Sequence, residues 1–122
     1  MVVLDTNLVI DIFNGHEPTR KALARFSEET LGITIFTEYE ILRGATEANE
    51  SRTRSFLGTF RLYYFTEPAM EETIGLYKKP GSKRVGELDL MILGICHAHS
   101  EVLATRDKAM GAFDRGVTVI RA

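Results

Sequence analysis

Alternation between strand-like and helix-like segments restricts the fold of this chain more than any other feature of its sequence. Five short runs are rich in apolar, aromatic or β-branched residues: 2–4, 32–37, 60–65, 101–105 and 116–120. Helix-like segments separate each run from the next. Parallel strands require such crossovers, whereas antiparallel strands need only a tight turn. The sequence therefore predicts a three-layer α/β fold, in which a five-stranded parallel sheet lies between helices.

Seven helices are expected in the intervals: 6–13, 18–31, 37–44, 47–57, 66–77, 87–98 and 107–114. Thr6 or Asn7 is a candidate N-cap of the first helix. The spacing of Met70, Ile74 and Tyr77 predicts that these side chains form the buried face of the fifth helix.

Chain length and charge limit the domain organisation and the partners of this protein. At 122 residues the chain can bury a core as a single domain spanning 1–122, and no repeat or linker divides it. A formal net charge of −2 gives no general attraction to nucleic acid, so such a partner would need a basic patch or a metal ion. Cys96 has no partner for an internal disulfide. Because there is no signal peptide and no apolar run near ~18 residues, we expect a cytoplasmic protein.

Four carboxylates are expected at one edge of the predicted sheet. Asp5 follows the first strand directly, and Asp107 lies two residues after Thr105 at the end of the fourth. Glu40 lies in the first turn of the helix after the second strand, and Asp89 begins the helix that leads into the fourth strand. Ligands of open parallel sheets bind beyond the carboxyl ends of the strands, where the winding direction reverses. We therefore expect the four acids to face one crevice.

Each of these acids also has a purely structural interpretation. Thr37 and Glu40 match a capping box, and Asp107 stands where an N-cap is expected. Asp89 in a first helical turn complements the helix dipole, and Asp5 could form a turn. Caps alone explain the set less well, because all four acids fall at the same edge of the sheet.

A divalent cation would relieve the repulsion among clustered carboxylates, which otherwise raise one another's pKa values. An all-oxygen ligand set favours Mg²⁺ or Mn²⁺ over Zn²⁺. Since a site of a few carboxylates keeps water on the metal, it suits hydrolysis of phosphodiesters by metal-activated water. The four acids are therefore candidate metal ligands and catalytic residues.

Four motifs, taken in order, resemble those of the PIN-domain nucleases, and more narrowly those of the VapC toxins of prokaryotic toxin–antitoxin pairs. They are VLDTN at 3–7, EILRG at 40–44, LDLMILGICHAH at 88–99 and VLATRD at 102–107. The resemblance extends over nearly the whole chain. It implies a Mg²⁺- or Mn²⁺-dependent endoribonuclease on a five-stranded parallel sheet, a homodimer, and a cognate antitoxin that blocks the site.

The resemblance also assigns roles to single residues. The acidic quartet of the family corresponds to Asp5, Glu40, Asp89 and Asp107. Thr105 matches the family's hydroxyl near the fourth acid, and Asn7 matches a polar position that either holds a water or caps a helix. The stretch GICHAH departs from the small apolar residues that are usual in the family at these positions. This departure leaves the acids unchanged, but helix packing or the dimer surface could differ from those of the family.

Basic side chains near the acids are candidate RNA contacts. The run that precedes the third acid comprises Lys78, Lys79, Lys83 and Arg84. This run could hold an RNA backbone, or it could be an ordinary solvated loop. Arg43 and Arg106 stand near acids in the sequence, and they could pair with those acids in the absence of metal or contact phosphate.

Structural roles are favoured for the histidines and for the aromatic strand. His97 and His99, two residues apart on a helix, do not share a face and cannot easily bind one ion. Tyr63, Tyr64 and Phe65 could stack on RNA bases, but an aromatic strand is more typical of a core or an interface.

Three other functions compete with a nuclease. A phosphatase of the haloacid dehalogenase type needs an acid two residues after its first aspartate, where this chain has Asn7. A receiver-like phosphoacceptor needs an aspartate after the third strand, where the chain supplies only Glu67. An inactive PIN-like domain that binds RNA or protein would keep the same acids, so it remains an alternative.

Overall fold

The computed structural model describes residues 1–27 and 29–121. Within them, five parallel strands form one sheet: β1 (Val2–Leu4), β2 (Leu31–Thr34), β3 (Arg61–Tyr63), β4 (Val102–Thr105) and β5 (Val117–Val119). The strand order is β3-β2-β1-β4-β5, so β1 is central and pairs with β2 and β4. The chain winds outward from β1 in both directions, which makes the carboxyl end of β1 the switch point of the sheet.

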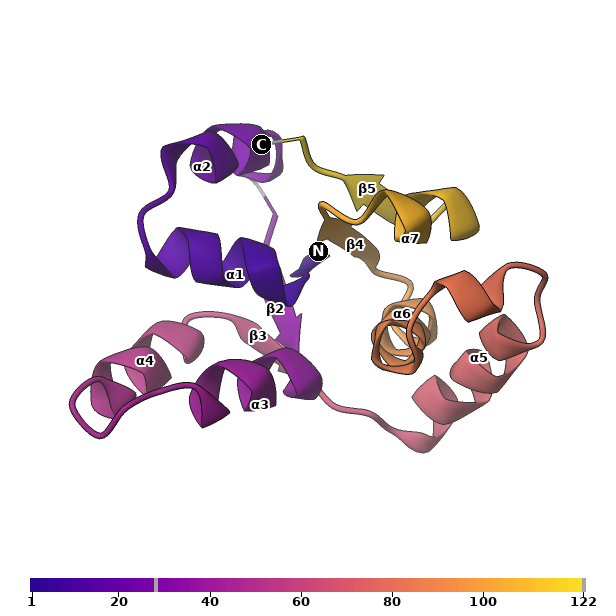
Figure 1. Cartoon of the computed structure of the whole chain (residues 1–122), viewed down its shortest axis with the longest axis horizontal. Coiled ribbons are helices and arrows are strands. Elements are labelled where there is room, and N and C mark those ends of the chain that lie inside the picture. Colours follow the sequence, from indigo (N-terminus) through magenta and orange to yellow (C-terminus); the bar gives the residue numbers. More distant parts are fainter. Residues whose placement is uncertain (28, 122) are drawn as a thin grey trace.

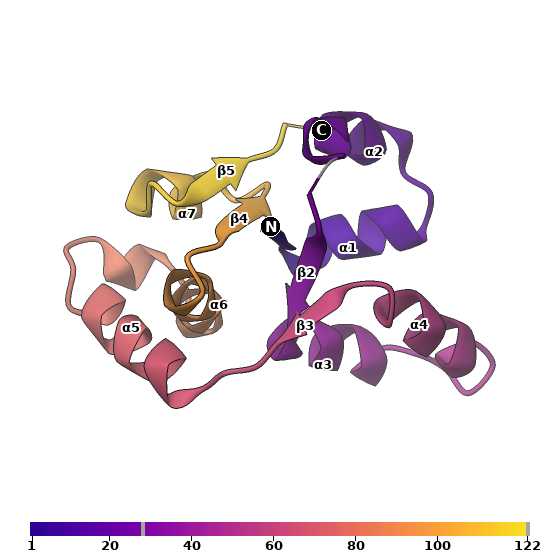
Figure 2. The same ribbon diagram turned by 180° about the vertical axis from the view of Figure 1, so that it is seen from behind.

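Seven α-helices connect the strands in the described residues: α1 (Thr6–Phe13), α2 (Glu17–Leu23), α3 (Ile35–Arg43), α4 (Glu50–Leu57), α5 (Glu67–Tyr77), α6 (Glu87–Ala98) and α7 (Lys108–Phe113). Helices α1 to α4 cover one face of the sheet and α5 to α7 the other, as Figure 1 and Figure 2 show from opposite sides. This arrangement confirms the predicted three-layer fold. No helix in the described parts of the chain is long and apolar enough to cross a membrane.

Alternate residues of the central strands fill two cores. Val3 and Leu103 belong to the core beneath α5, α6 and α7, whereas Val2, Leu4 and Ala104 belong to the core beneath α1 to α4. All five are at most 3% exposed. Burial on both faces explains why β1 is entirely apolar. Asp5, the residue after β1, is therefore the first polar residue at the carboxyl edge of this strand.

The second strand is shorter than predicted. It ends at Thr34, because the Thr34 hydroxyl accepts a hydrogen bond from the Thr37 N–H (3.3 Å) and caps α3. The prediction of a strand over 32–37 is therefore wrong at Ile35, Phe36 and Thr37, which are helical. Since Thr37 is not the N-cap, the capping box with Glu40 is also wrong, and Glu40 lies in the second turn of α3 rather than the first.

One predicted N-cap and several other helix boundaries also differ in the structure. The N-cap of α1 is Asp5 rather than Thr6 or Asn7. Helix α2 ends at Leu23, and the chain tightens into a 3-10 turn over Ala24–Phe26. Helix α4 begins only at Glu50, because the Asn49 side chain accepts a hydrogen bond from the Thr46 N–H (2.8 Å) and closes a turn over the preceding residues.

The buried face of α5 is not the predicted one. Ala69 and Leu76 are buried, whereas Met70, Ile74 and Tyr77 are 41%, 41% and 54% exposed. Helix α5 packs on α6 so closely that only small side chains fit at their crossing. Met70, Ile74 and Tyr77 therefore lie on its outer face.

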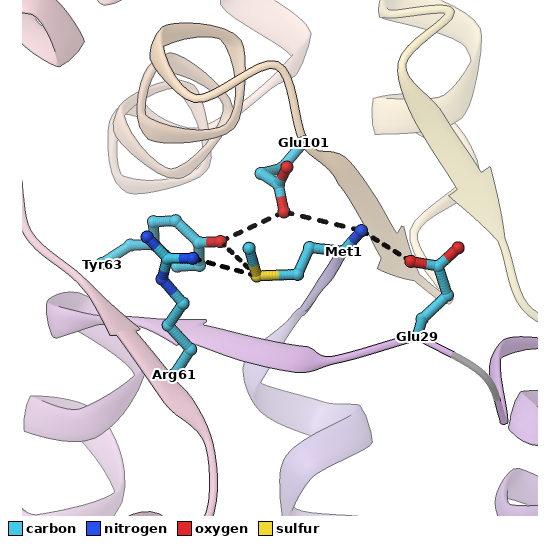
Figure 3. Close-up of polar contacts among 5 residues, drawn as sticks. All are labelled: Met1, Glu29, Arg61, Tyr63 and Glu101. Atoms are coloured by element: carbon cyan, nitrogen blue, oxygen red, sulfur yellow. Dashed lines mark hydrogen bonds and ion pairs between the residues drawn. The ribbon is translucent and has the colours of Figure 1, made fainter.

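The amino ends of the strands are joined by a polar cluster, shown in Figure 3. The Met1 amino group lies 2.6 Å from Glu29 Oε2 and 3.9 Å from Glu101 Oε2. The Tyr63 hydroxyl donates to Glu101 (3.1 Å) and lies 2.8 Å from Met1 Sδ, which Arg61 also approaches. Burial, followed by the Glu101 hydrogen bond, raises the pKa of Tyr63 to about 12. Tyr63 thus has a structural role at the edge opposite the acids.

Candidate functional site

The four predicted acids line one cavity at the carboxyl edge of the sheet. This cavity has a volume of about 450 Å³. Its walls are formed by Asp5, Thr6, Asn7, Glu40, Leu88, Asp89, Thr105, Arg106 and Asp107. The structure therefore brings together the quartet and both supporting residues, Asn7 and Thr105, that the sequence pointed to.

Asp5 both caps a helix and faces the cavity. Its Oδ1 accepts a hydrogen bond from the Thr6 N–H (2.9 Å), and its Oδ2 accepts one from the Thr105 hydroxyl (2.6 Å). The Asp5 N–H donates to the carbonyl of Ala104, which extends the pairing of β1 with β4. Asp5 is thus fixed in position by its backbone and by both carboxylate oxygens.

Glu40 is held by a pair of hydroxyl groups. Thr6 Oγ1 donates to Glu40 Oε1 (3.0 Å), and it lies 2.9 Å from Oγ1 of the fully buried Thr37. Sequence reasoning did not assign Thr6 to Glu40, because these residues lie 34 positions apart and no local pattern connects them. The one signal in the sequence that could have pointed to this contact is the position of Thr6, a hydroxyl residue directly after the first acid.

Asp107 is the N-cap of α7, as one of its sequence interpretations predicted. Its Oδ1 accepts hydrogen bonds from the N–H groups of Ala109 (2.8 Å) and Met110 (3.2 Å). The Asp107 N–H in turn donates to Thr105 Oγ1 (3.1 Å). Thr105, which is 1% exposed, therefore contacts both the first and the fourth acid.

Asp89 lies in the first turn of α6, within the electric field of the other three acids. Burial is the largest cause that raises its pKa to about 6, and the charges of Asp5, Asp107 and Glu40 add to the effect. The four carboxylates therefore lie close enough for their charges to act on one another.

The sequence matches the model of a known protein family. The profile of the PIN domain matches residues 2–116 of the sequence. The chain belongs to the PIN domain family. The resemblance found in the sequence motifs is thereby confirmed at the level of the family.

Solved structures that contain a chain of similar fold include a toxin–antitoxin complex. This PIN domain is similar to a chain of a toxin–antitoxin complex from Klebsiella pneumoniae, with a TM-score of 0.83, 28% identity, and 98% of this chain and 97% of that chain covered. It also shares its fold with chains of FitAcB from Neisseria gonorrhoeae (TM-score 0.77, 22% identity, 99% and 97% covered) and of DNA-bound VapBC from Salmonella typhimurium (TM-score 0.74, 23% identity, 97% and 95% covered). No curated protein shows a significant match.

The donors in the cavity of this PIN domain suit a hard divalent cation. Within residues 1–27 and 29–121, no group of three or more His, Cys, Asp and Glu side chains is placed to hold one ion directly. Mg²⁺ usually binds through one or two carboxylates and keeps several waters, so spaced acids suit it better than a closed cage would. The carboxylates, the Asn7 amide and the hydroxyls supply only donors of this class.

Neither arginine near the acids pairs with a member of the quartet, contrary to one prediction. Arg106 Nη1 lies 2.7 Å from Oδ2 of Asp11, a residue of α1 outside the quartet. The Arg43 guanidinium lies over the ring of Tyr39, 5.4 Å from its centroid. Asp11 and Tyr39 are thus the partners of these two arginines in the structure, and a phosphate contact of either arginine stays a prediction.

The basic run of the PIN domain is folded against α7. Ser82–Arg84 form a 3-10 turn in which Ser82 is buried, whereas the four basic residues of the run are exposed. The Lys79 ammonium lies 5.6 Å from the centroid of the Phe113 ring at the end of α7. Asp107 caps the other end of this helix. The run thus lies beside an element that also carries a cavity acid.

The histidines and the cysteine have structural partners. His97 Nε2 lies 2.5 Å from Oδ2 of the buried Asp114, and the His99 ring contacts the edge of Tyr63 at a centroid distance of 4.7 Å. Cys96 is buried, and its burial raises the pKa of the thiol to about 12. The histidine contacts agree with the structural interpretation of His97 and His99.

The pKa of Asp89 leads to a prediction for the metal-free PIN domain. Since the folded pKa is about 6 and the ordinary value is 3.8, stability is lost as the pH rises through about 6. In chelator at pH 7.5, we expect Asp89→Asn to raise the free energy of unfolding by about 1 kcal/mol, after allowance for solvent screening, and Tm by about 4 °C. Thermal unfolding should show this gain shrinking as the pH falls toward about 4. A gain that does not change with pH would contradict the electrostatic explanation.

Proposed function

We propose that this PIN domain is a Mg²⁺- or Mn²⁺-dependent endoribonuclease that acts in the cytoplasm as the toxin of a toxin–antitoxin pair. The observation that carries the proposal is the cavity lined by Asp5, Glu40, Asp89 and Asp107 at the switch point of the sheet. Further support comes from the similarity to a chain of the Klebsiella pneumoniae toxin–antitoxin complex over 98% of this chain. A cognate antitoxin would act by covering the cavity.

In the proposed mechanism, one or two of the four carboxylates would bind the cation directly and the others would bind it through its water molecules, while the neighbouring hydroxyls hold the carboxylates. A bound Mg²⁺ or Mn²⁺ would lower the pKa of a water molecule and offset the charge of the phosphodiester. Thr105 and Thr6 fix Asp5 and Glu40 through their hydrogen bonds. Asn7, whose side chain lines the same cavity, is available to orient water or substrate. No protein nucleophile is required, because water is the attacking group.

Cleavage of RNA under defined metal conditions tests this proposal. The purified protein is incubated with a mixed pool of structured RNA and with DNA of matching sequence, in Mg²⁺, in Mn²⁺ and in chelator. We expect RNA fragments only when metal is present, and we expect none from an Asp107→Asn preparation, which controls for contaminating nucleases. RNA that is bound but never cut would instead identify an inactive PIN-like binding module.

The basic run beside α7 is proposed to hold the RNA backbone, together with Arg43 and Arg106. The test variant replaces Lys79, Lys83 and Arg84 by Gln. Loss of three phosphate contacts should weaken RNA binding and reduce the slope of log K against log salt concentration by about 2. Mn²⁺ binding should not change, because the three side chains do not line the acid cavity.

A matched variant on α2 and its 3-10 turn separates a local contact from a general loss of charge. It replaces Arg20, Lys21 and Arg25, which are also exposed, by Gln. Filter binding at several salt concentrations should give this control nearly the wild-type slope. Equal losses in both variants would show that the basic run has no specific contact with RNA.

The outer face of α5 is proposed as the homodimer surface. Met70, Ile74 and Tyr77 are exposed there and line a mostly apolar cavity of about 390 Å³. We expect Ile74→Lys to convert a dimer to a monomer in light scattering, because a charge would be buried in the interface. Ile10→Lys, at a similarly exposed position on α1, should leave the dimer intact. A wild-type protein that is monomeric at all concentrations would contradict the assignment.

A further inference from the structure

Arg106 is the one basic residue that lines the acid cavity within the part of the chain that the structure describes. It stands between Thr105, which contacts Asp5, and Asp107. A guanidinium matches carboxylates in geometry and cannot lose its charge, so it would compete with a metal ion for the same acids. Its guanidinium nevertheless pairs with Asp11, 2.7 Å away on α1, and not with a carboxylate of the quartet.

Asp11 is held in place independently of Arg106. The hydroxyl of Thr19, a residue that is fully buried in α2, donates to Asp11 Oδ2 (2.7 Å). Nδ1 of His16, the N-cap of α2, lies 2.9 Å from the Thr19 hydroxyl and 3.7 Å from Asp11 Oδ2. The Asp11 side chain is 18% exposed. The start of α2 therefore fixes the carboxylate to which Arg106 is attached.

The position of Asp11 on α1 places this attachment just beyond the cavity. Asp11 follows Asn7 by four residues, so the two lie on the same face of the helix, one turn apart. Asn7 lines the cavity, and Asp11 does not. A guanidinium bound to Asp11 is thus kept at the margin of the cavity.

We propose that Asp11 is a positioning residue that holds Arg106 away from the four cavity acids, so that a metal ion and not this arginine neutralises them. The inference rests on the proposed metal-dependent function. It assigns Asp11 no contact with metal or substrate. Its effect is carried entirely by Arg106.

The test is a double-mutant cycle with Asp11→Asn and Arg106→Gln, measured by Mn²⁺ calorimetry. Asn keeps the size of Asp11 and can still accept from Thr19, but it no longer holds the guanidinium by charge. We expect Asp11→Asn to weaken Mn²⁺ binding about 10-fold, which corresponds to the strength of one close charge pair at a partly exposed site. The double variant should return to within about 2-fold of the wild type, because the competing cation is gone.

Glu50→Gln is the matched control. It releases Arg54 from an ion pair of 3.1 Å on α4, outside the cavity, and should leave Mn²⁺ affinity unchanged. Two outcomes would overturn the inference while Mn²⁺ still binds the wild type. Asp11→Asn could bind Mn²⁺ as tightly as the wild type, or the double variant could bind as weakly as Asp11→Asn alone.

A second readout does not depend on metal. In chelator, adding Arg106→Gln to the Asp11→Asn protein should lower Tm, because the released arginine has moved onto the mutually repelling acids and stabilises them. No change in Tm would show that Arg106 stays in solvent, and the inference would fail. If the wild type binds no Mn²⁺, the proposed function fails, and this Tm comparison alone decides whether Asp11 restrains Arg106.

Discussion

Replacing Asp5 by Asn is expected to abolish Mn²⁺ binding and to reduce RNA cleavage by at least about 100-fold. Substituting a residue that only supports a metal ligand costs up to about 100-fold in activity, and loss of a ligand itself should cost at least as much. Asp5 is the acid at the switch point, and both of its oxygens are already oriented by Thr6 and Thr105. The substitution removes its charge and replaces one oxygen by a donor group, which faces the Thr105 hydroxyl or the Thr6 N–H.

This substitution separates the metal role of Asp5 from its capping role. Asn is about as good an N-cap as Asp, so α1 should keep its start and the fold should remain. Circular dichroism and thermal unfolding check the fold, and calorimetry with Mn²⁺ checks the site. Thr66→Ala is a control for the loss of a helix cap. The Thr66 hydroxyl caps α5 by accepting a hydrogen bond from the Ala69 N–H (3.4 Å), so this variant should lower Tm without changing Mn²⁺ affinity.

Unchanged Mn²⁺ affinity in Asp5→Asn would contradict the proposed site. Asp5 and Asp107 would then be helix caps and Asp89 a partner of the helix dipole, and the common location of the four carboxylates would have no bearing on metal. Loss of both metal binding and folding would be resolved by Asp107→Asn, since its substitution affects the short helix α7 and leaves the central strand unchanged.

Gly94→Ala is expected to destabilise the fold by about 2 kcal/mol and to lower Tm by about 8 °C. A Cβ at this position would lie 1.9 Å from Thr73 Oγ1 and 2.7 Å from the Ala69 carbonyl oxygen, so α5 and α6 would have to move apart. Overpacking of a close contact costs up to about 3 kcal/mol. The better helix propensity of Ala returns about 1 kcal/mol of this.

Gly75→Ala is the matched control for this prediction. Gly75 lies in α5, and nothing is within 4 Å of the position its Cβ would take. This variant should therefore gain about 1 kcal/mol from helix propensity alone. Urea unfolding of both variants measures the difference. Equal stability of the two would show that the α5–α6 contact is looser than the structure indicates.

The parallel sheet and the location of the acids could be predicted because both depend on simple, local signals. An apolar run of a few residues identifies a doubly buried strand, and a carboxylate directly after it must lie at the carboxyl edge. Asp5 and Asp107 follow strands in this way, and the structure places them in one cavity. Identifying that cavity as a metal site remains a prediction.

The contacts that orient the acids could not be read from the sequence, because they join distant segments. Thr6 reaches Glu40 across the sheet edge, and Arg106 reaches Asp11 rather than the acid next to it. The boundary between β2 and α3 was also misjudged. Ile35 and Phe36 have strand-like side chains, but the Thr34 hydroxyl caps a helix there, and a cap of this kind competes directly with strand propensity.

The hydrogen bond from Thr105 to Asp5 spans 100 positions of the chain, and it has a consequence for the time at which the site forms during synthesis. Strand β1 is synthesised before β4, and it stays unpaired on one side until β4 has been made. Contacts of such long sequence separation form late in folding. A nascent chain that ends before Thr105 and Asp107 holds Asp5 without the hydroxyl that orients it and without the fourth acid. Unfinished copies of the protein therefore carry no complete cavity.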